Sequence, residues 1–533
     1  MKRRAKSAVL VLWTLLAAPS AVPAAVAPTP FTLIGPIEKF TLDTPATSAC
    51  GSSVDPALVS SRMTVHGIEV VIPCNLIIQM PATYLTADDV FKLNPAGSSE
   101  SGLALADTKP PLAVFEATIV GNIVMHTGKA THVAGLVYIS QHSLATGGGY
   151  IKSIDLTNRE MRIGADPSAP LSPQDARVRI NDAKGVYDHH LPTPPGPITV
   201  DRRFTVDTEN PTVHALTGYP MCLPSNAGDA DCPAINRPIR GGKALTNFVM
   251  GTGSLPGAPP DALPIPPCQE RLTDPPCFPD KQAPFMLGDY VNYSGTLAKD
   301  NAGTLHISAH TIVANVGIFT QGKMPAYVSL DESLIGTMGP LTRRDPPSTA
   351  SPTLPQETQD RLKIEGFTTD PSRNVEIYAI DVNPVTGEQL LRLLNVVRPQ
   401  SVPFGRFRLI VGKRAGILFD RNSVPKGATR ELMVHIANTD GSTLDGEPVP
   451  TKPKIAHGLI AGQYVAPVGE YIFPENTVHG DPLVPNNFEC VAFLQLGSGP
   501  LNTNDRTNPT PIVARLSPWP GPTAKIEVDC GPQ

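Results

Sequence analysis

The chain has 533 residues and a formal net charge of −5, and only 5% of its residues are aromatic. A nucleic-acid-binding protein needs a basic surface with stacking aromatic side chains, so this composition excludes that class. The 59 prolines and 44 glycines leave little room for long helices, and the length predicts three to four domains of roughly 150 residues each.

The N-terminus has the pattern of a secretory signal peptide over residues 1–24. Lysines and arginines precede the apolar run AVLVLWTLLAA, and small residues and prolines follow it. We expect cleavage after Ala24, with cleavage after Ala27 as the alternative. An uncleaved membrane anchor would need about 20 apolar residues, roughly twice the length of this run. Removal of the peptide leaves 39 Lys and Arg against 48 Asp and Glu, a formal charge of −9 on a secreted chain without a membrane span.

All eight cysteines follow the signal peptide, and an even number in an exported chain predicts disulfide bonds. Spacing alone leaves their connectivity open. A zinc site is the alternative, but no two cysteines have the two-residue gap of zinc ligands. The cysteines form four neighbouring pairs: Cys50 with Cys74, Cys222 with Cys232, Cys268 with Cys277, and Cys490 with Cys530.

Residues 25–110 predict a β region with one short helix. Apolar residues alternate on both sides of His66-Gly67, which indicates a strand pair around a tight turn. Thr86 precedes two aspartates and an apolar stretch, a pattern that predicts a capped helical turn closed by Pro95.

Strand patterns dominate residues 111–218, and residues 284–340 repeat the plan in shorter form. The segment ISQHSLATGGGYI, from Ile139 to Ile151, aligns without a gap with ISAHTIVANVGIF, from Ile307 to Phe319. Gly121 precedes the first copy by 18 residues and Gly295 precedes the second by 12, so one loop between them is longer by six residues in the first copy. We therefore predict two small barrels, related by duplication, of the oligonucleotide/oligosaccharide-binding (OB) type, with a flat sandwich as the alternative.

The remaining segments are joined by proline-rich sequence. Residues 219–283 are rich in proline, which has no backbone N–H to donate to a neighbouring strand, so they cannot form a central strand of a sheet. We predict that they form a surface excursion stiffened by two small disulfide loops. Residues 341–355 are a second proline-rich linker. Residues 356–440 predict an immunoglobulin-like sandwich, and residues 441–533 are rich in turns. The predicted fold class is all-β.

Two histidine-bearing strands raise the question of catalysis. Alternate residues of a strand share a face, so Ser140 and His142 point the same way, as do His306, Ser308 and His310. Serine beside histidine suggests a nucleophile with its base, and His306 with His310 suggests a metal site. No carboxylate or third ligand stands at a suitable spacing. We interpret these histidines as structural, with His142 and His310 at equivalent strand ends, and assign no catalytic residue.

A second group of possible ligands lies between Lys184 and Pro211. Carboxylates together with imidazole suit a divalent cation, and paired carboxylates can cleave glycosidic bonds. Loop carboxylates are more often simply solvated, so no metal or other cofactor is assigned. The candidate metal ligands are Asp188, His189, His190, Asp201, Asp207 and Glu209.

Three longer phrases carry a family resemblance: RFTVDTENPTVHALTGYPMCLP, SAHTIVANVGIFT and GLIAGQYVAPVGEYIFPEN. They resemble segments of a group of uncharacterised secreted proteins of filamentous fungi and soil bacteria, over most of residues 110 to 500. The resemblance implies export and a β-rich fold. That group has no assigned activity, so the resemblance assigns no catalytic residue here.

The sequence favours an exported multidomain β protein that binds or scaffolds at the cell envelope or outside the cell, with carbohydrate or another protein as its ligand. A secreted hydrolase, with its site between a barrel and the proline-rich excursion, is the alternative. A metal-dependent binding module built on the Asp188 to Glu209 group is the third hypothesis.

Overall fold

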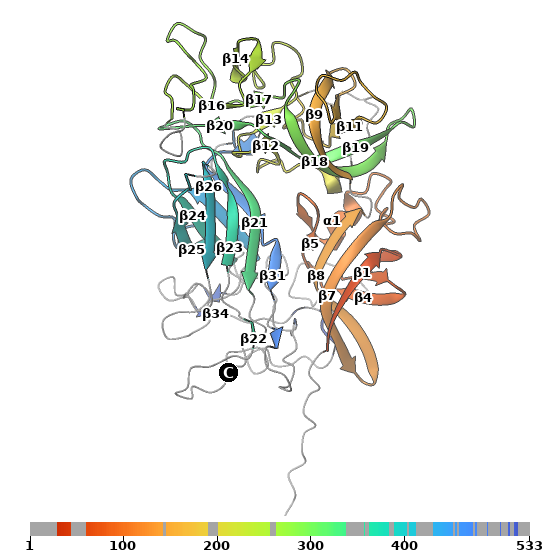
Figure 1. The fold of residues 1–533 in the computed structure, drawn as a ribbon. Coiled ribbons are helices and arrows are strands. Elements are labelled where there is room, and N and C mark those ends of the chain that lie inside the picture. Colours follow the sequence, from red (N-terminus) through yellow and green to blue (C-terminus); the bar gives the residue numbers. More distant parts are fainter. Residues whose placement is uncertain are drawn as a thin grey trace, which may run out of the picture.

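The structure is a computed structural model, and Figure 1 shows its fold. Strands make up 48% of it and helices 4%, so the chain is all-β, as the sequence predicts. The signal peptide lies outside the described residues. These are 29–43, 60–141, 145–189, 201–255, 263–336, 356–357, 362–382, 388–401, 404–411, 430–450, 454–455, 458–472, 475–476, 488, 501–502, 510–511, 516 and 518–520.

The first eight strands form one sheet, here called the N-terminal sheet, in the order β1-β7-β8-β4-β3-β2. Only Ile37 and Glu38 separate β1 from β2, and these two strands stand at the opposite ends of that order. One continuous segment therefore connects both ends of the sheet. The strands are β1 (Thr29–Pro36), β2 (Lys39–Leu42), β3 (Ser61–Val65), β4 (Ile68–Ile72), β5 (Ile78–Gln79), β6 (Tyr84–Leu85), β7 (Phe115–His126) and β8 (Lys129–Gln141).

The α-helix of the described residues, α1 (Ala87–Lys92), lies where the sequence predicts it. The Thr86 hydroxyl accepts a hydrogen bond from the Asp89 amide, and the Asp89 carboxylate accepts one from the Thr86 amide at 3.0 Å. This capping box satisfies two amides that the first helical turn would leave unpaired. Val90 and Phe91 are buried and pack the helix onto the sheet core.

Five strands form a closed barrel, here called the barrel, in the order β9-β10-β11-β19-β18, with β18 pairing again with β9. β11 and β19 run parallel, and the other neighbours run antiparallel. The short β12 (Val213–Ala215) extends the sheet beside β19. The barrel strands are β9 (Ala145–Asp155), β10 (Glu160–Gly164), β11 (Ala176–Ile180), β18 (Tyr290–Lys299) and β19 (Leu305–Ala314).

A bulged hairpin with a glycine at the bulge occurs in both sheets. The register of β7 on β8 shifts between Val120 and Gly121, and that of β18 on β19 shifts between Ser294 and Gly295. The glycines noted in the sequence therefore mark irregularities of the two hairpins. Each copy of the repeated segment begins in the second strand of its hairpin.

The two segments predicted as separate barrels are combined differently in the structure. β7 and β8, from residues 111–218, join the strands of residues 25–110. β9, β10 and β11, from the same segment, close a barrel with β18 and β19, from residues 284–340. Apolar alternation identifies a strand but does not say which distant strand is its partner. The strands could therefore be predicted, whereas their assembly into sheets could not.

Replacing Gly121 or Gly295 with alanine is expected to lower the free energy of unfolding by about 1 to 3 kcal/mol, because the added methyl group meets backbone. A Cβ atom at Gly121 would lie 2.0 Å from the Val133 carbonyl oxygen, and one at Gly295 would lie 2.5 Å from that of Ser308. Urea denaturation measures the change. Gly228→Ala is the control, since its nearest neighbour would lie 3.5 Å away. Equal stability of all three variants would contradict the role of the bulges.

A long insertion, residues 181–289, separates β11 from β18. It holds the disulfides Cys222–Cys232 and Cys268–Cys277, which confirms both pairings predicted for this part of the chain. Cys74 is also disulfide-bonded, and Cys50, Cys490 and Cys530 lie outside the described residues. Besides β12, the described elements of the insertion are η1 (Arg202–Phe204), β13 (Met221–Cys222), η2 (Ala234–Asn236), β14 (Ile239–Arg240), β15 (Lys243–Ala244), β16 (Asn247–Val249) and β17 (Ala283–Pro284).

Two four-stranded sheets, here called the sheet pair, follow the barrel. One has the order β26-β23-β21-β31 and the other β25-β24-β27-β30. Phe407 and Ile364 of the first sheet share an apolar core with Val375 and Val434 of the second. The strands are β21 (Val328–Gly336), β23 (Leu362–Thr368), β24 (Val375–Val382), β25 (Gln389–Val397), β26 (Arg406–Val411), β27 (Glu431–Ile436), β30 (Gln463–Pro467) and β31 (Glu470–Ile472).

The sheet pair extends beyond residues 356–440 on both sides, because β21, β30 and β31 belong to it. Its core is also continuous with that of the N-terminal sheet, which contributes Ile72 and Ile139. The remaining strands are β20 (Gly317–Phe319), β22 (Gln356–Glu357), β28 (Lys454–Ile455), β29 (Leu459–Ile460), β32 (Glu475–Asn476), β33 (Leu501–Asn502) and β34 (Thr510–Pro511).

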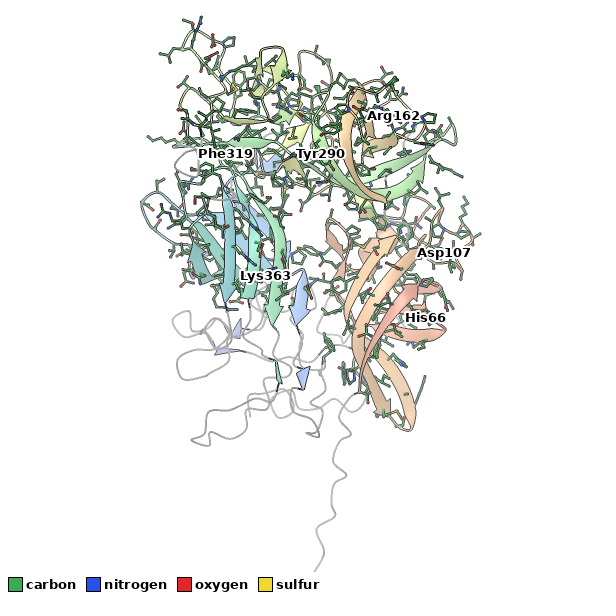
Figure 2. All side chains as sticks on the ribbon, viewed as in Figure 1. His66, Asp107, Arg162, Tyr290, Phe319 and Lys363 are labelled. Atoms are coloured by element: carbon green, nitrogen blue, oxygen red, sulfur yellow. A yellow bond between two sulfur atoms is a disulfide. The ribbon has the colours of Figure 1, made fainter. Side chains whose placement is uncertain are left out.

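The N-terminal sheet, the barrel with its insertion, and the sheet pair are grouped around a common centre (Figure 1). In Figure 2, His66 marks the N-terminal sheet, Arg162 and Tyr290 the barrel, and Lys363 the sheet pair. None of the described helices is long and apolar enough to cross a membrane.

Candidate functional site

The first predicted serine and histidine pair is only partly described. Ser140 lies near the end of β8, and its hydroxyl donates a hydrogen bond to the Glu116 carboxylate at 3.2 Å. His142 lies outside the described residues. Ser140 therefore serves the pairing of β8 with β7 in the described part of the chain.

His306, Ser308 and His310 lie at alternate positions of β19, as the sequence predicts, and all three are buried. Burial lowers the pKa of both imidazoles, that of His310 to about 4. The His310 Nδ1 lies 3.0 Å from the Thr311 hydroxyl, while its Nε2 has no hydrogen-bond partner among the described residues. Among the described residues, no serine or carboxylate hydrogen-bonds to either ring, so no nucleophile and base pair is assembled here.

The predicted metal ligands do not converge. Asp188 binds Arg159 at 2.6 Å, and Asp201 binds Arg203 at 2.7 Å. The Asp207 carboxylate accepts hydrogen bonds from Asn210, Glu209 is exposed at the surface, and His190 lies outside the described residues. Within the described ranges, no three His, Cys, Asp or Glu side chains are placed to hold a metal ion.

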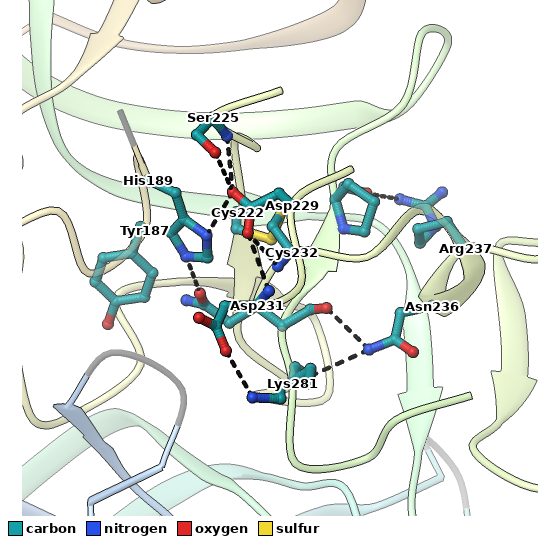
Figure 3. The surroundings of a disulfide bond; sticks show 12 residues. Tyr187, His189, Cys222, Ser225, Asp229, Asp231, Cys232, Asn236, Arg237 and Lys281 are labelled. Carbon is teal, nitrogen blue, oxygen red and sulfur yellow. Dashed lines mark hydrogen bonds and ion pairs between the residues drawn. A yellow bond between two sulfur atoms is a disulfide. The ribbon is translucent and has the colours of Figure 1, made fainter. Parts of the chain in front are cut away.

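His189 belongs to a buried network beside the Cys222–Cys232 disulfide (Figure 3). Its Nδ1 lies 3.1 Å from an Asp229 oxygen and its Nε2 lies 2.5 Å from the Gln282 side-chain oxygen. The Ser225 hydroxyl donates to Asp229 at 2.9 Å and not to the histidine. Burial opposes ionisation of Asp229, but hydrogen bonds from Ser225 and other groups lower its pKa. The network therefore fixes the insertion and does not prepare a nucleophile.

A different group of side chains meets where the three parts of the molecule come together, and we call it the tyrosine junction. It consists of Tyr84 in β6, Tyr138 in β8, Tyr464 in β30, Tyr471 in β31, Arg430 before β27, Asp207 in the insertion and Asp331 in β21.

Hydrogen bonds connect the parts of this junction. The Tyr84 hydroxyl donates to Glu431 at 2.5 Å, which links the N-terminal sheet to the sheet pair. Asn210 bonds to both the amide and the carbonyl of Val465, at 2.9 and 2.8 Å, which links the insertion to β30. Strands from distant parts of the sequence are thereby fixed around one polar centre.

The four tyrosines of the junction are neutral phenols at physiological pH. Burial raises the pKa of each hydroxyl, that of Tyr138 to about 12. The negative charge of Asp207 adds to the effect at Tyr84 and Tyr464. These rings can therefore both donate and accept hydrogen bonds while they offer apolar faces.

Two carboxyl groups of the junction have raised pKa values. Burial raises the pKa of Asp207, and it raises that of Asp331 to about 6. Asp331 is nonetheless open to solvent, and Asp207, Tyr84, Tyr138 and Tyr464 are half-buried. Aromatic and polar side chains that remain partly accessible to solvent are the kinds of group that ligand sites use.

The sequence pointed to Asp207 alone among these residues. The others come from segments hundreds of residues apart, and each is an ordinary strand residue in its own context. Only the assembled fold brings them together. Comparison of the chain with known families, curated proteins and solved structures gave no match.

Proposed function

We propose that the chain is an exported binding protein whose ligand is a carbohydrate, held at the tyrosine junction. The observation that carries the proposal is the set of Tyr84, Tyr138, Tyr464 and Tyr471 beside solvent-accessible carboxyl groups. Tyrosine offers an apolar face to the C–H groups of a sugar ring, and nearby carboxyl and hydroxyl groups suit the sugar hydroxyls. A protein ligand is the alternative that the test below separates.

The proposed architecture consists of two OB-like barrels related by duplication. If β1 and β2 count as one strand and the two-residue strands β5 and β6 are left out, the N-terminal sheet and the barrel share the pairing order first, second, third, fifth, fourth, first. In both, the third and fifth strands are the parallel pair, β4 with β8 and β11 with β19. The bulged hairpins at Gly121 and Gly295 occupy the same place in this order. OB-type barrels often bind oligosaccharides, which supports the proposed ligand class.

The sheet pair is proposed to be an immunoglobulin-like sandwich that spans residues 328–472. Its first, second, fifth and eighth strands, β21, β23, β26 and β31, share one sheet, while β25, β24, β27 and β30 form the other. Two packed sheets of this kind, here antiparallel except for the pair β21 and β31, are typical of such domains. Export is supported by the disulfides and by the N-terminal sequence pattern.

Replacing Tyr464 with leucine is expected to weaken carbohydrate binding about tenfold, equivalent to about 1.4 kcal/mol, because the ring is lost while apolar packing is retained. A glycan array identifies the ligand, and isothermal titration measures its affinity for both proteins. Phe278→Ala is the control, since Phe278 is 42% exposed on the insertion. Wild-type protein that binds no glycan, or that binds equally after the Tyr464 substitution, would contradict the proposal.

A hydrolase is the second proposal, and the raised pKa values of Asp207 and Asp331 favour it. Glycoside hydrolysis needs one protonated and one ionised carboxyl group at the scissile bond. The charges of both carboxyl groups contribute to the raised pKa of Tyr464, which places both groups near that ring. The site of a hydrolase would therefore lie at the tyrosine junction rather than between a barrel and the proline-rich excursion. Release of reducing sugar by the wild type, and its loss in Asp331→Asn, would distinguish this function from binding alone.

A further inference from the structure

Arg430 differs from the other buried arginines among the described residues. Arg179, Arg203 and Arg237 each form an ion pair with a carboxylate. Arg430 is 8% exposed and forms no ion pair in the described structure. Its Nε makes no hydrogen bond, and its contact with the Gln79 side-chain oxygen is long, at 3.4 Å. The guanidinium is therefore buried with no ion-pair partner among the described residues.

The groups that surround Arg430 are mostly uncharged. The positive charge of Arg430 lowers the pKa of the phenols of Tyr84, Tyr138 and Tyr471 and so opposes the effect of burial. The Tyr471 hydroxyl also contacts the Arg430 side chain. Phenols can accept a hydrogen bond from the guanidinium but cannot neutralise it. The neighbouring Glu431 accepts a hydrogen bond from Tyr84. The Arg430 side chain thus has hydrogen-bond donors that the described residues of the junction do not satisfy.

Burying an unpaired positive charge costs desolvation free energy, and proteins retain such a charge mainly where a bound anion pairs with it. The planar guanidinium matches a planar carboxylate, to which it can donate two parallel hydrogen bonds. Asp207, Asp331 and Glu431 make the rest of the junction acidic, which favours a ligand with single, separated charges over a polyphosphate.

We propose that Arg430, which Tyr471 contacts and Tyr138 flanks, binds the carboxylate of an acidic sugar, so that the ligand is a glycan containing uronic acid. This inference rests on the proposed carbohydrate-binding function and adds the chemical class of the sugar. The guanidinium holds the carboxylate, the Tyr138 hydroxyl donates to a remaining oxygen lone pair, and Tyr464 lies beside the neighbouring part of the ligand.

The test compares dimers of galacturonate, glucuronate and mannuronate with the corresponding neutral disaccharides, by isothermal titration against the full chain. At least one uronate dimer is expected to bind about tenfold or more tightly than its neutral counterpart, as a charge-assisted bidentate contact requires. Arg430→Gln is expected to remove that preference, whereas Phe278→Ala, on the exposed surface of the insertion, is expected to retain it.

The outcomes separate the two proposals. Neutral and acidic sugars that bind equally, with no effect of Arg430→Gln, would overturn the uronate assignment and leave carbohydrate binding intact. Binding of no sugar would overturn both proposals.

Thermal melting of the unliganded protein supplies a second readout. Arg430→Gln removes a charge without a partner and is expected to leave the melting temperature unchanged or to raise it. Arg237→Met, which breaks a paired arginine, is the matched control and should lower it. A comparable loss in both variants would show that Arg430 is a structural residue and would overturn the proposal.

Discussion

Replacing Arg237 with methionine is expected to lower the free energy of unfolding by about 3 to 5 kcal/mol, because the substitution leaves a buried carboxylate without its partner. The Arg237 guanidinium is completely buried and forms two hydrogen bonds of 2.7 Å to Asp289, and it also donates to the Pro284 carbonyl. The Asp289 carboxylate is 3% exposed. Chemical denaturation followed by circular dichroism measures the loss.

The double variant Arg237→Met with Asp289→Asn is the control for this prediction. It removes both charges, and the asparagine can still accept the hydrogen bond that the Met286 amide gives to Asp289 at 2.8 Å. We expect it to recover a large part of the stability lost in Arg237→Met. If Arg237→Met unfolds at the same denaturant concentration as the wild type, the ion pair makes no net contribution to the free energy of unfolding, which would contradict the prediction.

Acidification from pH 6.5 to pH 4 is expected to destabilise the wild type by about 3 kcal/mol through His310 alone, since each unit of pKa shift is worth about 1.4 kcal/mol. The pKa of His310 is about 4 in the folded chain, against the ordinary 6.5, because burial disfavours the charged ring. The unfolded chain therefore binds a proton first as the pH falls through 6.5. The loss is complete near the folded pKa.

His310→Gln is the variant that isolates this effect. Asp331 has a raised pKa and acts with the opposite sign, since its contribution is lost as the pH rises through about 6. The pH profiles of wild type and His310→Gln are therefore compared as a difference, in which Asp331 cancels. The stability of the wild type relative to His310→Gln, measured by urea denaturation, should fall by about 3 kcal/mol between pH 7 and pH 4. Parallel profiles would mean that His310 titrates normally in the folded chain.

Local sequence patterns predicted the local structure well. The capping residues Thr86 and Asp89 identified α1, and proximity in sequence identified Cys222–Cys232 and Cys268–Cys277. The glycines at 121 and 295, noted in the sequence as flanks of the repeated segment, lie at the bulges of two hairpins. Each of these features depends on residues a short distance apart, so the physical cause lies within the pattern itself.

Long-range pairing could not be predicted in the same way. β7 and β8 pair with strands before residue 110, and β21, β30 and β31 complete the sheet pair from outside residues 356–440. The core that joins the N-terminal sheet to the sheet pair also differs from the separable domain that the proline-rich flanks predict. We therefore expect limited proteolysis not to release residues 356–440 as a stable fragment.

The candidate site illustrates the same limit. Arg430 and Tyr84 have nothing unusual in their sequence neighbourhoods, and their significance depends on a missing countercharge and on burial. The histidines and carboxylates that the sequence did single out mostly have local partners. His189 is bound by Asp229 and Gln282, and Asp207 closes a turn with Asn210.

The insertion between β11 and β18 also sets the order in which the chain can fold. During synthesis the main strands of the N-terminal sheet are all present once residue 141 has left the ribosome. Val178 of β11, in contrast, can pair only after Ile307, its partner in β19, has been synthesised. Until then the edges of β9 and β11 expose unpaired backbone, which is the kind of surface that leads to aggregation. The two disulfides close short loops within the waiting segment, and each reduces the chain entropy that barrel closure must overcome. Oxidation before β19 emerges should therefore speed closure of the barrel, and reducing conditions should slow it.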